Sequence, residues 1–392
     1  MQYTFQPTST QRKVLSLILP AILVHLLYWP IVLTQGTTIV PNLFIENIGQ
    51  YPRYLMTITM IFGSMIAGAT SEGGASVAFP VLTLIFQIQP TIARDFSFMI
   101  QSVGMTAASF SILSSRIRIE YHALKWVSIG GIFGLIIGLE GITPYLPARF
   151  SKMLFVTIWG SFAFSLFLQN QHYNRTVLQE IPIAQWNHGW HWWQGKINMN
   201  AVVLFLAGVF GGIFSAIAGS GIDICSFAVL TLLFRIDEKI ATPTSVLLMA
   251  FNTCVGFLYR QVVQGGVSAE AWPLFVVCVP VVVLGAPLGS VLGSWVHRLT
   301  LARMIYFTDL VQLVGALVIV KPWLGEDAGW LMSVTVAVCL VSCSMFYWMS
   351  RGGLRLLSSL KEDEREVEMR TEGEEMDVVD VDVSVELEET KR

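Results

Sequence analysis

Apolar stretches separated by short polar ones follow one another along most of the chain. A helix that crosses the hydrocarbon core of a bilayer needs roughly 20 mainly apolar residues, and shorter runs favour half-helices or hairpins. Most of the runs approach that length, so the pattern predicts an all-α polytopic membrane protein. The predicted helical segments are 14–34, 55–67, 75–87, 91–113, 124–142, 153–168, 202–218, 222–234, 240–259, 271–295, 304–320 and 330–349.

One stretch of the sequence occurs twice. Residues 80–97 read PVLTLIFQIQPTIARDFS and residues 228–245 read AVLTLLFRIDEKIATPTS, at an offset of 148 without a gap. Nine of the eighteen positions are identical. Each copy follows a break of small residues, which reads GATSEGG at 68–74 and GSG at 219–221. Paired apolar segments that glycine interrupts at corresponding places are typical of secondary transporters.

Each half of the chain holds about five predicted segments, an odd number. The second half therefore enters the membrane from the opposite side, so we expect two inverted repeats with one flanking span at each end. The two short segments, 75–87 and 222–234, predict a hairpin or a broken helix in each half. When the N-terminus is placed in the cytoplasm, the cytoplasmic loops hold more Lys and Arg than the others, as the positive-inside rule expects.

The segments divide the chain into six parts. These are an N-terminal signal-anchor span with its loop (1–54), the first repeat (55–168), a polar linker rich in Trp and His (169–200), the second repeat (201–322), a final span (323–357) and an acidic tail (358–392). A cleaved signal peptide is the alternative for the first span, but that run lacks a clear small-residue cleavage site. From Lys361 onward the tail has fourteen acidic and five basic residues and no aromatic one, so we expect it to be disordered.

Composition supports the membrane prediction and limits the chemistry. The chain is 54% hydrophobic and 13% charged, whereas about 25% of the residues of a soluble domain are charged. The five cysteines lie in apolar runs without metal spacing. His188 and His191 of the linker have no acid or Cys beside them to complete a metal site, and a Trp-rich segment at the membrane surface is favoured instead. We expect no metal, cofactor or nucleic-acid partner, and no enzymatic activity, because the membrane segments hold no catalytic arrangement.

The two breaks form the candidate substrate site. Glycine lets the chain turn sharply and lets the backbone approach a ligand. The short helices that follow begin with unpaired N–H groups and a positive dipole end, and in an inverted pair these helix starts approach each other near the membrane midplane, which suits an anion. The alternative for each hydroxyl is a bond to its own helix. The candidate substrate-binding residues are Ser71, Gly73, Gly74, Ser76, Ser97, Gly219, Ser220, Gly221, Ser245 and Asn252.

Three acidic residues lie in or near the predicted site. Glu72 is in the first break, Asp223 is beside the second, and Asp309 lies in a later apolar run. A carboxylate repels an anion unless it is protonated, so these three residues are candidates for proton coupling. The alternative for Glu72 and Asp223 is a helix cap, in which the carboxylate accepts hydrogen bonds from the first N–H groups of the following helix.

The doubled pattern resembles the TauE/SafE-type sulfite exporter family of membrane permeases. The resemblance rests on the glycine-rich break, the short apolar helix with Pro80, the sequences IARDFS at 92–97 and IATPTS at 240–245, and the glycine-laced fourth segment of each half. It extends over roughly residues 55–320. The resemblance implies transport of sulfite or of small organosulfur and organic anions, coupled to an ion gradient. The breaks depart from the family's GxGGG-like pattern, because they read SEGGA and GSGID.

Two other functions fit the same residues. The chain could be a proton-linked carrier of a cation or a neutral metabolite that uses Glu72 and Asp223 as its charge. It could also be a non-transporting membrane scaffold whose acidic tail recruits basic partners. The expected partners of a transporter are a small anionic substrate and the lipid bilayer. The sequence leaves the membrane and the oligomeric state open, a homo-oligomer included.

Overall fold

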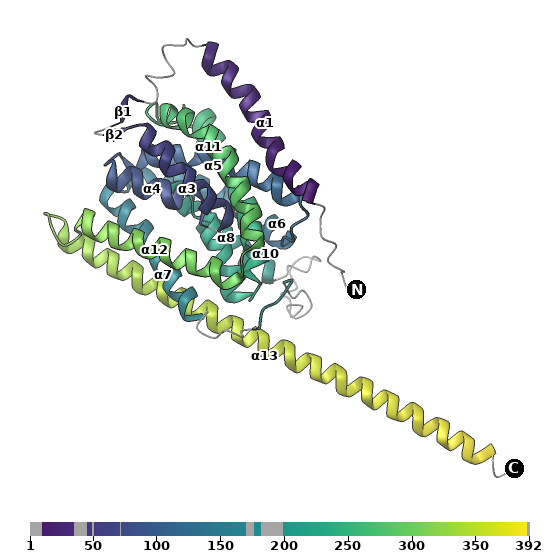
Figure 1. Cartoon of the computed structure of the whole chain (residues 1–392). Helices are drawn as coiled ribbons and strands as arrows, with labels where there is room; N and C mark the ends of the chain where they lie inside the picture. The colour runs from purple at the N-terminus through teal and green to yellow at the C-terminus, as the bar shows by residue number, and fades with distance from the viewer. Residues whose placement is uncertain are drawn as a thin grey trace.

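The computed structural model describes residues 10–34, 45–48, 51–70, 72–169, 176–181 and 199–389, and almost all of them are helical (Figure 1). The helices are α1 (Thr10–Thr34), α3 (Tyr54–Ala69), α4 (Gly73–Pro80), α5 (Pro90–Ser114), α6 (Tyr121–Ile137), α7 (Ala148–Gln169), α8 (Met199–Ala218), α9 (Ile222–Ala228), α10 (Glu238–Leu258), α11 (Ala271–Trp295), α12 (Arg298–Val320) and α13 (Ala328–Glu389). Short π or 3-10 turns are η1 (Val81–Ile85), η2 (Gly138–Ile142), η3 (Thr143–Tyr145), η5 (Val229–Leu233) and η6 (Tyr259–Val263). Strands β1 (Asn47–Ile48) and β2 (Tyr51–Pro52) form one antiparallel pair.

Eight of the described helices are long and apolar enough to cross a membrane. They are Pro90–Ser114, Tyr121–Tyr145, Ala148–Leu168, Met199–Ala218, Glu238–Val263, Ala271–Trp295, Ala302–Val320 and Ala328–Glu362. Shorter apolar helices lie at Ile18–Pro30, Tyr54–Ala69, Ser76–Ile85 and Ile222–Leu233. These elements confirm the predicted all-α polytopic membrane protein, including the short helices that follow the two breaks.

The repeated sequence folds into the same local structure twice. In each half a short α-helix continues into a five-residue π-helix, η1 or η5, whose bounds differ by the sequence offset of 148. Two residues after each π-helix the chain turns with a positive φ of 55°, at Gln87 and at Arg235. Hydroxyl groups match as well, because Thr83 and Thr231 each donate to the carbonyl four residues earlier at 2.7 Å. The repeat is therefore structural as well as sequential.

The two halves pack crosswise. The fourth helix of the first half, α6, lies against α8, the first helix of the second half, and α11 lies against α3 in the same manner. A Cβ atom on Gly130 of α6 would overlap Phe205 O, and one on Gly289 of α11 would overlap Met65 O. Only glycine permits helices to approach this closely. Each half therefore packs its first helix against the fourth helix of the other half.

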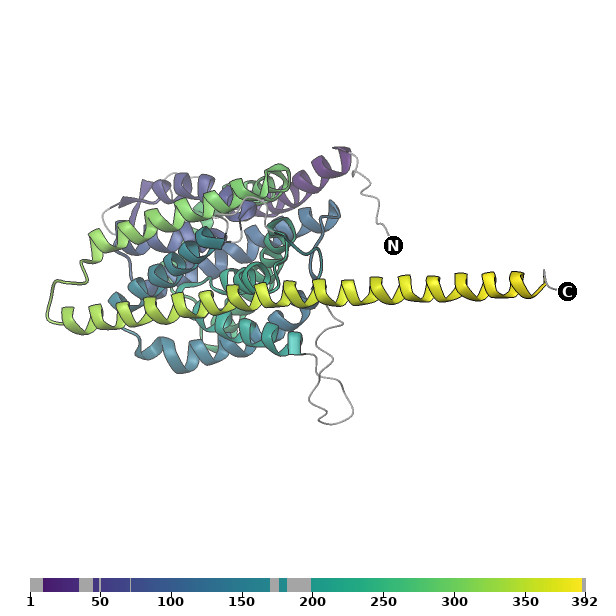
Figure 2. The same ribbon diagram turned by 90° about the horizontal axis from the view of Figure 1, so that it is seen from below.

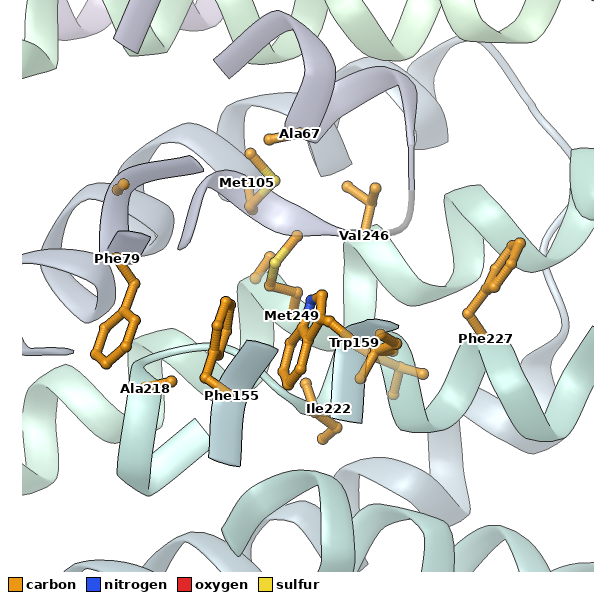
Figure 3. Close-up of a cluster of buried hydrophobic side chains, with 14 of the residues drawn as sticks. Ala67, Phe79, Met105, Phe155, Trp159, Ala218, Ile222, Phe227, Val246 and Met249 are labelled. Carbon is orange, nitrogen blue, oxygen red and sulfur yellow. The ribbon is translucent and has the colours of Figure 1, made fainter. Parts of the chain in front are cut away.

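Apolar side chains fill the interior and also cover much of the outer surface. Side chains from α4, α7, α9 and α10 gather in one buried cluster, in which Phe155 and Trp159 stack with ring centroids 4.1 Å apart (Figure 3). Outward-facing positions are apolar too, as at Phe62, Phe210 and Leu258, where more than half of the residue surface is exposed. An apolar exterior suits a lipid environment.

The C-terminal segment differs from its sequence-based prediction. Helix α13 continues without interruption to Glu389 and extends far beyond the helical body (Figure 2), whereas we expected a disordered tail from residue 358. The tail is rich in Glu, which favours helix, and it lacks proline. A segment of low hydrophobicity has little apolar surface with which to pack against the rest of the protein. It can still form a helix that stands alone.

Candidate functional site

The two glycine breaks meet inside the protein. Gly73, at the start of α4, has a positive φ of 73°. A Cβ atom at Gly73 would lie 2.8 Å from Asp223 Oδ2 of α9 and 2.8 Å from Gln101 Oε1 of α5, and it would overlap Met249 Sδ of α10. Residues of both halves therefore surround the first break. Position 73 needs glycine, because its φ is positive and there is no room for a side chain.

The second break packs against the first half in turn. Gly219 has a φ of 82°, and a Cβ atom there would overlap Ser97 of α5 and lie 2.8 Å from Arg94 O. The amide of Gln101 links the two, because its Nε2 donates to Gly219 O at 2.9 Å and to Ser97 O at 3.1 Å. Helix α5 of the first half thus holds the break of the second half by a buried hydrogen bond.

Gln101 was not among the residues predicted from the sequence. It is 1% exposed, and its Oε1 has no hydrogen-bond partner among the described residues. Its position is the repeat equivalent of Met249, since 249 − 101 = 148. Both side chains lie against Gly73, so two equivalent positions of the repeat meet at the first break. The available signal was a glutamine in the middle of an otherwise apolar span, where a polar side chain needs a partner.

The three predicted acids come together at the breaks. Glu72 is 1% exposed, and Asp223 and Asp309 are fully buried. The carboxyl groups of Glu72, of Asp309 from α12 and of Asp223 lie close enough to interact through their charges. Neither carboxyl oxygen of Glu72 or of Asp309 has a hydrogen-bond partner among the described residues. Neighbouring carboxyl groups that are buried away from water repel each other when all of them are ionised, and a proton bound to one of them relieves that repulsion.

The acids differ in their other contacts. Glu72 makes no side-chain hydrogen bond that caps α4. Asp223 accepts a hydrogen bond from Ser220 Oγ, and it lies close to the backbone N–H groups of Gly221 and Ile224 at the start of α9. No Lys, Arg or His forms an ion pair with any of the three acids in the part of the chain that the structure describes. Neither α4 nor α9 is capped by a side-chain hydrogen bond of its N-cap residue, so Glu72 is not a helix cap, and among the described residues the one hydrogen bond that the Asp223 carboxylate accepts comes from a side chain, that of Ser220.

Asn252 is a second buried polar group without a partner. It lies on α10 with no exposed surface, and neither Oδ1 nor Nδ2 forms a hydrogen bond with the described residues. Its Nδ2 lies 3.0 Å from where a Cβ atom on Gly131 of α6 would stand, beside Ile222 at the start of α9. A buried amide left unpaired costs about 1–3 kcal/mol. A bound solute with an acceptor atom would offset that cost.

The hydroxyl groups proposed for the site are mostly engaged locally. Ser97 Oγ donates to Ala93 O at 2.8 Å and Ser245 Oγ to Ala241 O at 2.9 Å, both within their own helices. Ser76 Oγ donates to Gly73 O at 2.7 Å and so stabilises the first turn of α4. Such bonds leave a hydroxyl oxygen free to accept but not to donate.

The remaining predicted residues lie at the edges of the site. Gly74 has ordinary packing, with its nearest neighbours 3.6 Å from an added Cβ atom. Gly221 packs closely against α8, where an added Cβ atom would be 2.7 Å from Ser215 N. Ser71 lies outside the described residues. No group of three or more His, Cys, Asp or Glu residues that could hold a metal ion occurs in the described ranges.

Comparison with known families agrees with these observations. The family model described as Sulfite exporter TauE/SafE matches residues 55–317, which is about two thirds of the chain. The chain belongs to the TauE/SafE family. No curated protein and no solved structure is similar enough to the chain to count as a match.

Membership in the TauE/SafE family fixes the broad class of activity. The matched residues begin one position after the start of α3 and end near the end of α12, so they include both breaks and the three acids. Together with the eight candidate spans, the match identifies an integral multi-pass membrane protein of a transporter family rather than one of an enzyme family.

Proposed function

We propose that the protein carries sulfite or small organosulfur and organic anions across its membrane and couples their movement to protons. The observation that supports this most is the meeting of both breaks around Gly73, with Glu72 and Asp309 beside it. Discontinuous helices that meet at the interface between inverted repeats are where secondary transporters bind their substrates. The inverted orientation of the halves is part of the proposal.

The site offers donors suited to an anion. The first N–H groups of α4, from Gly73 onward, have no acceptor within the helix. Asn252 Nδ2 adds an unpaired amide donor from the other half. An anion at this place also profits from the positive end of the helix dipole.

Whether an anion can bind depends on the ionisation of the neighbouring carboxyl groups. With both Glu72 and Asp309 ionised, the site would repel the substrate at short range in a medium of low dielectric constant. A proton shared by the pair removes one negative charge and makes room for the negative charge of the substrate. Proton and anion then occupy the protein together, which is co-transport of the two. The uptake of anion is therefore expected to fall as the pH rises and the pair loses its proton.

Flux into vesicles tests the proposal. Purified protein in liposomes is given labelled sulfite, a small sulfonate or a small carboxylate, with and without an inward proton gradient. We expect the proton gradient to accelerate entry of at least one of these anions about tenfold and a protonophore to remove the acceleration. If none of the three anions moves under a gradient of either direction, the proposal is wrong.

The three buried acids without an ion-pairing cation in the described structure also favour a second candidate, a proton-linked carrier of a cation or a neutral metabolite. The same vesicles distinguish the two. A neutral or cationic solute that dissipates an imposed proton gradient, while sulfite does not, would favour the second candidate.

A further inference from the structure

The start of α10 borders a pocket that none of the predicted site residues occupies. It has about 310 Å³ of empty space, most of which is open to solvent or too narrow for a solute, so it is a shallow, narrow cleft. Helices α3, α5, α10 and α11, which lie together in the body (Figure 1), supply its walls. Its lining includes Gly68, Ile112, Lys239, Thr242, Pro243 and Ser290.

The lining of the pocket combines an exposed residue with buried residues that are close in sequence to the first break. Lys239 is exposed, whereas Gly68 and Ala69 are buried and lie four and three residues before Glu72. Thr242 is 6% exposed, and its Oγ1 has no hydrogen-bond partner among the described residues. A buried, unpaired hydroxyl and an exposed ammonium group on the same small pocket are suited to a small anion.

The repeat places a very different structure at the corresponding position of the other half. Thr242, Pro243 and Ile112 line the pocket, and their equivalents at the offset of 148 are Arg94, Asp95 and Arg260, since 242 − 94, 243 − 95 and 260 − 112 all equal 148. Three lining residues of the pocket thus correspond to three charged residues.

The charged residues form a buried network. Asp95 is fully buried, and its Oδ1 accepts from Arg94 Nη2 at 2.9 Å and from Arg260 Nε at 3.0 Å. Its Oδ2 accepts from Arg260 Nη2 at 2.8 Å and from both N and Oγ of Ser268, each at 2.8 Å. The carboxylate therefore ties α5 to η6 and to the loop before α11.

The network lies beside the second break, because Arg94 O is 2.8 Å from where a Cβ atom on Gly219 would stand. The pocket lining includes Gly68 and Ala69, which precede the first break in the sequence. A two-state carrier needs one path open and the equivalent path closed at any moment.

Building on the proposed transport function, we infer that these two places are opposite ends of one transport path. The pocket at Lys239 and Thr242 is the open end, which admits a small anion towards the breaks. The Arg94–Asp95–Arg260–Ser268 network is the gate that closes the other end. When the carrier changes state, the ion pairs separate and the walls of the pocket come together. The pocket residue Ile117 lies between Arg116 and Arg118 in the sequence, and Lys239 lies four residues after Arg235, in loops that the positive-inside rule predicts to be cytoplasmic.

Accessibility of single cysteines to a membrane-impermeant thiol reagent tests this inference without knowledge of the substrate. The five native cysteines are first replaced by alanine or serine. One reporter is T242C in the pocket, and the other is I217C, because Ile217 is 5% exposed and is the repeat equivalent of the pocket residue Ala69. We expect T242C to react from one side of the membrane and I217C to be protected from both sides.

Opening the gate should reverse this pattern. Asp95→Asn removes the charge that holds both arginines, and Arg260→Gln removes one arginine while the Arg94–Asp95 pair stays. Either variant should raise the reactivity of I217C at least tenfold from the side opposite to the pocket and lower that of T242C. Arg260→Gln keeps the test decisive if Asp95→Asn fails to fold.

Two results would overturn the inference. One is equal reactivity of both reporters from the same side in the parent protein. The other is unchanged reactivity of both reporters in a folded gate variant. Because labelling needs no substrate, a failure of sulfite transport in vesicles and a failure of the gate are separate outcomes.

Discussion

The two breaks share a frame and differ in chemistry. At the offset of 148, Glu72 of the first break corresponds to Ser220 of the second, and Asp223 corresponds to Ala75. The Glu72 carboxyl group meets that of Asp309, whereas the Asp223 carboxylate accepts a hydrogen bond from Ser220 at the start of α9. The repeated sequence thus builds two similar backbone structures. The carboxyl groups that could bind a proton lie at positions where the two copies differ.

The same lesson applies to the ends of the path. The start of α5 has a carboxylate between two arginines, and the start of α10 has a threonine and a proline at the matching positions. A charged network needs every partner in place, because breaking a buried ion pair costs about 3–5 kcal/mol. In the described part of the chain, the pocket at the start of α10 has no such ion pairs to break. Because the two copies of the repeat differ at these positions, one end of the path can be closed while the other is open in the same conformation.

The largest effect is expected from filling the space where the two halves meet. Gly73→Ala would place a methyl group among Gln101, Asp223 and Met249 and would require a left-handed backbone that costs alanine about 1–2 kcal/mol. We expect vesicle transport to fall below detection and the thermal unfolding midpoint to drop. Gly74→Ala is the matched control, since an added Cβ atom there has ordinary contacts, and it should transport at near the parent rate. Equal effects of the two changes would contradict the central position of Gly73.

A second experiment separates the two acids. Glu72→Gln removes one of the two buried carboxyl groups that we propose to share a proton, so we expect proton-driven uptake to fall at least tenfold and to lose its pH dependence. Asp223→Asn keeps the Glu72–Asp309 pair, so its uptake should be several-fold slower but should still decline as the pH rises. Uptake rates measured across a range of external pH check both expectations. A pH response that survives Glu72→Gln and disappears in Asp223→Asn would assign the proton to the other break.

A third change probes the unpaired amide of the second half. Asn252→Leu replaces it with an apolar side chain of similar volume, which removes a buried group without a partner. If Asn252 binds the substrate, KM should rise about tenfold, which corresponds to about 1.4 kcal/mol, while the unfolding midpoint stays level or rises. The neighbouring Thr253→Val is the control, because that hydroxyl donates to Met249 O of its own helix at 2.7 Å. An unchanged KM in Asn252→Leu would exclude Asn252 from the site.

The smallest effects are expected at the matched serines. Ser97→Ala and Ser245→Ala each remove a hydrogen bond within one helix, and neither leaves a buried donor unpaired. Transport should change less than about twofold and stability by about 1 kcal/mol at most. A much larger loss in one serine variant than in the other, measured as flux per folded molecule, would reveal a functional difference between the halves.

The sequence by itself determined the spans, the repeat and the positions of the breaks. The length and apolar character of a span are local properties, because each backbone polar group in lipid must be satisfied within its own helix. The offset of 148 likewise predicts that η1 and η5 have the same shape. The acids could be named as candidates because a carboxyl group is rare in an apolar run.

Only the tertiary structure decided which of these residues meet. Glu72 and Asp309 come from opposite halves, and no spacing rule relates a break to a helix so far along the chain. Gln101 belongs to the site because its side chain donates a hydrogen bond to Gly219 O of the second break. Ser97 and Ser245 form hydrogen bonds within their own helices. The ion-pair network could not be predicted from the sequence either, because Arg94, Asp95 and Arg260 come together only when α5 and η6 pack against each other. Contacts between distant segments depend on how helices cross, and the hydrophobic pattern of each helix does not specify that.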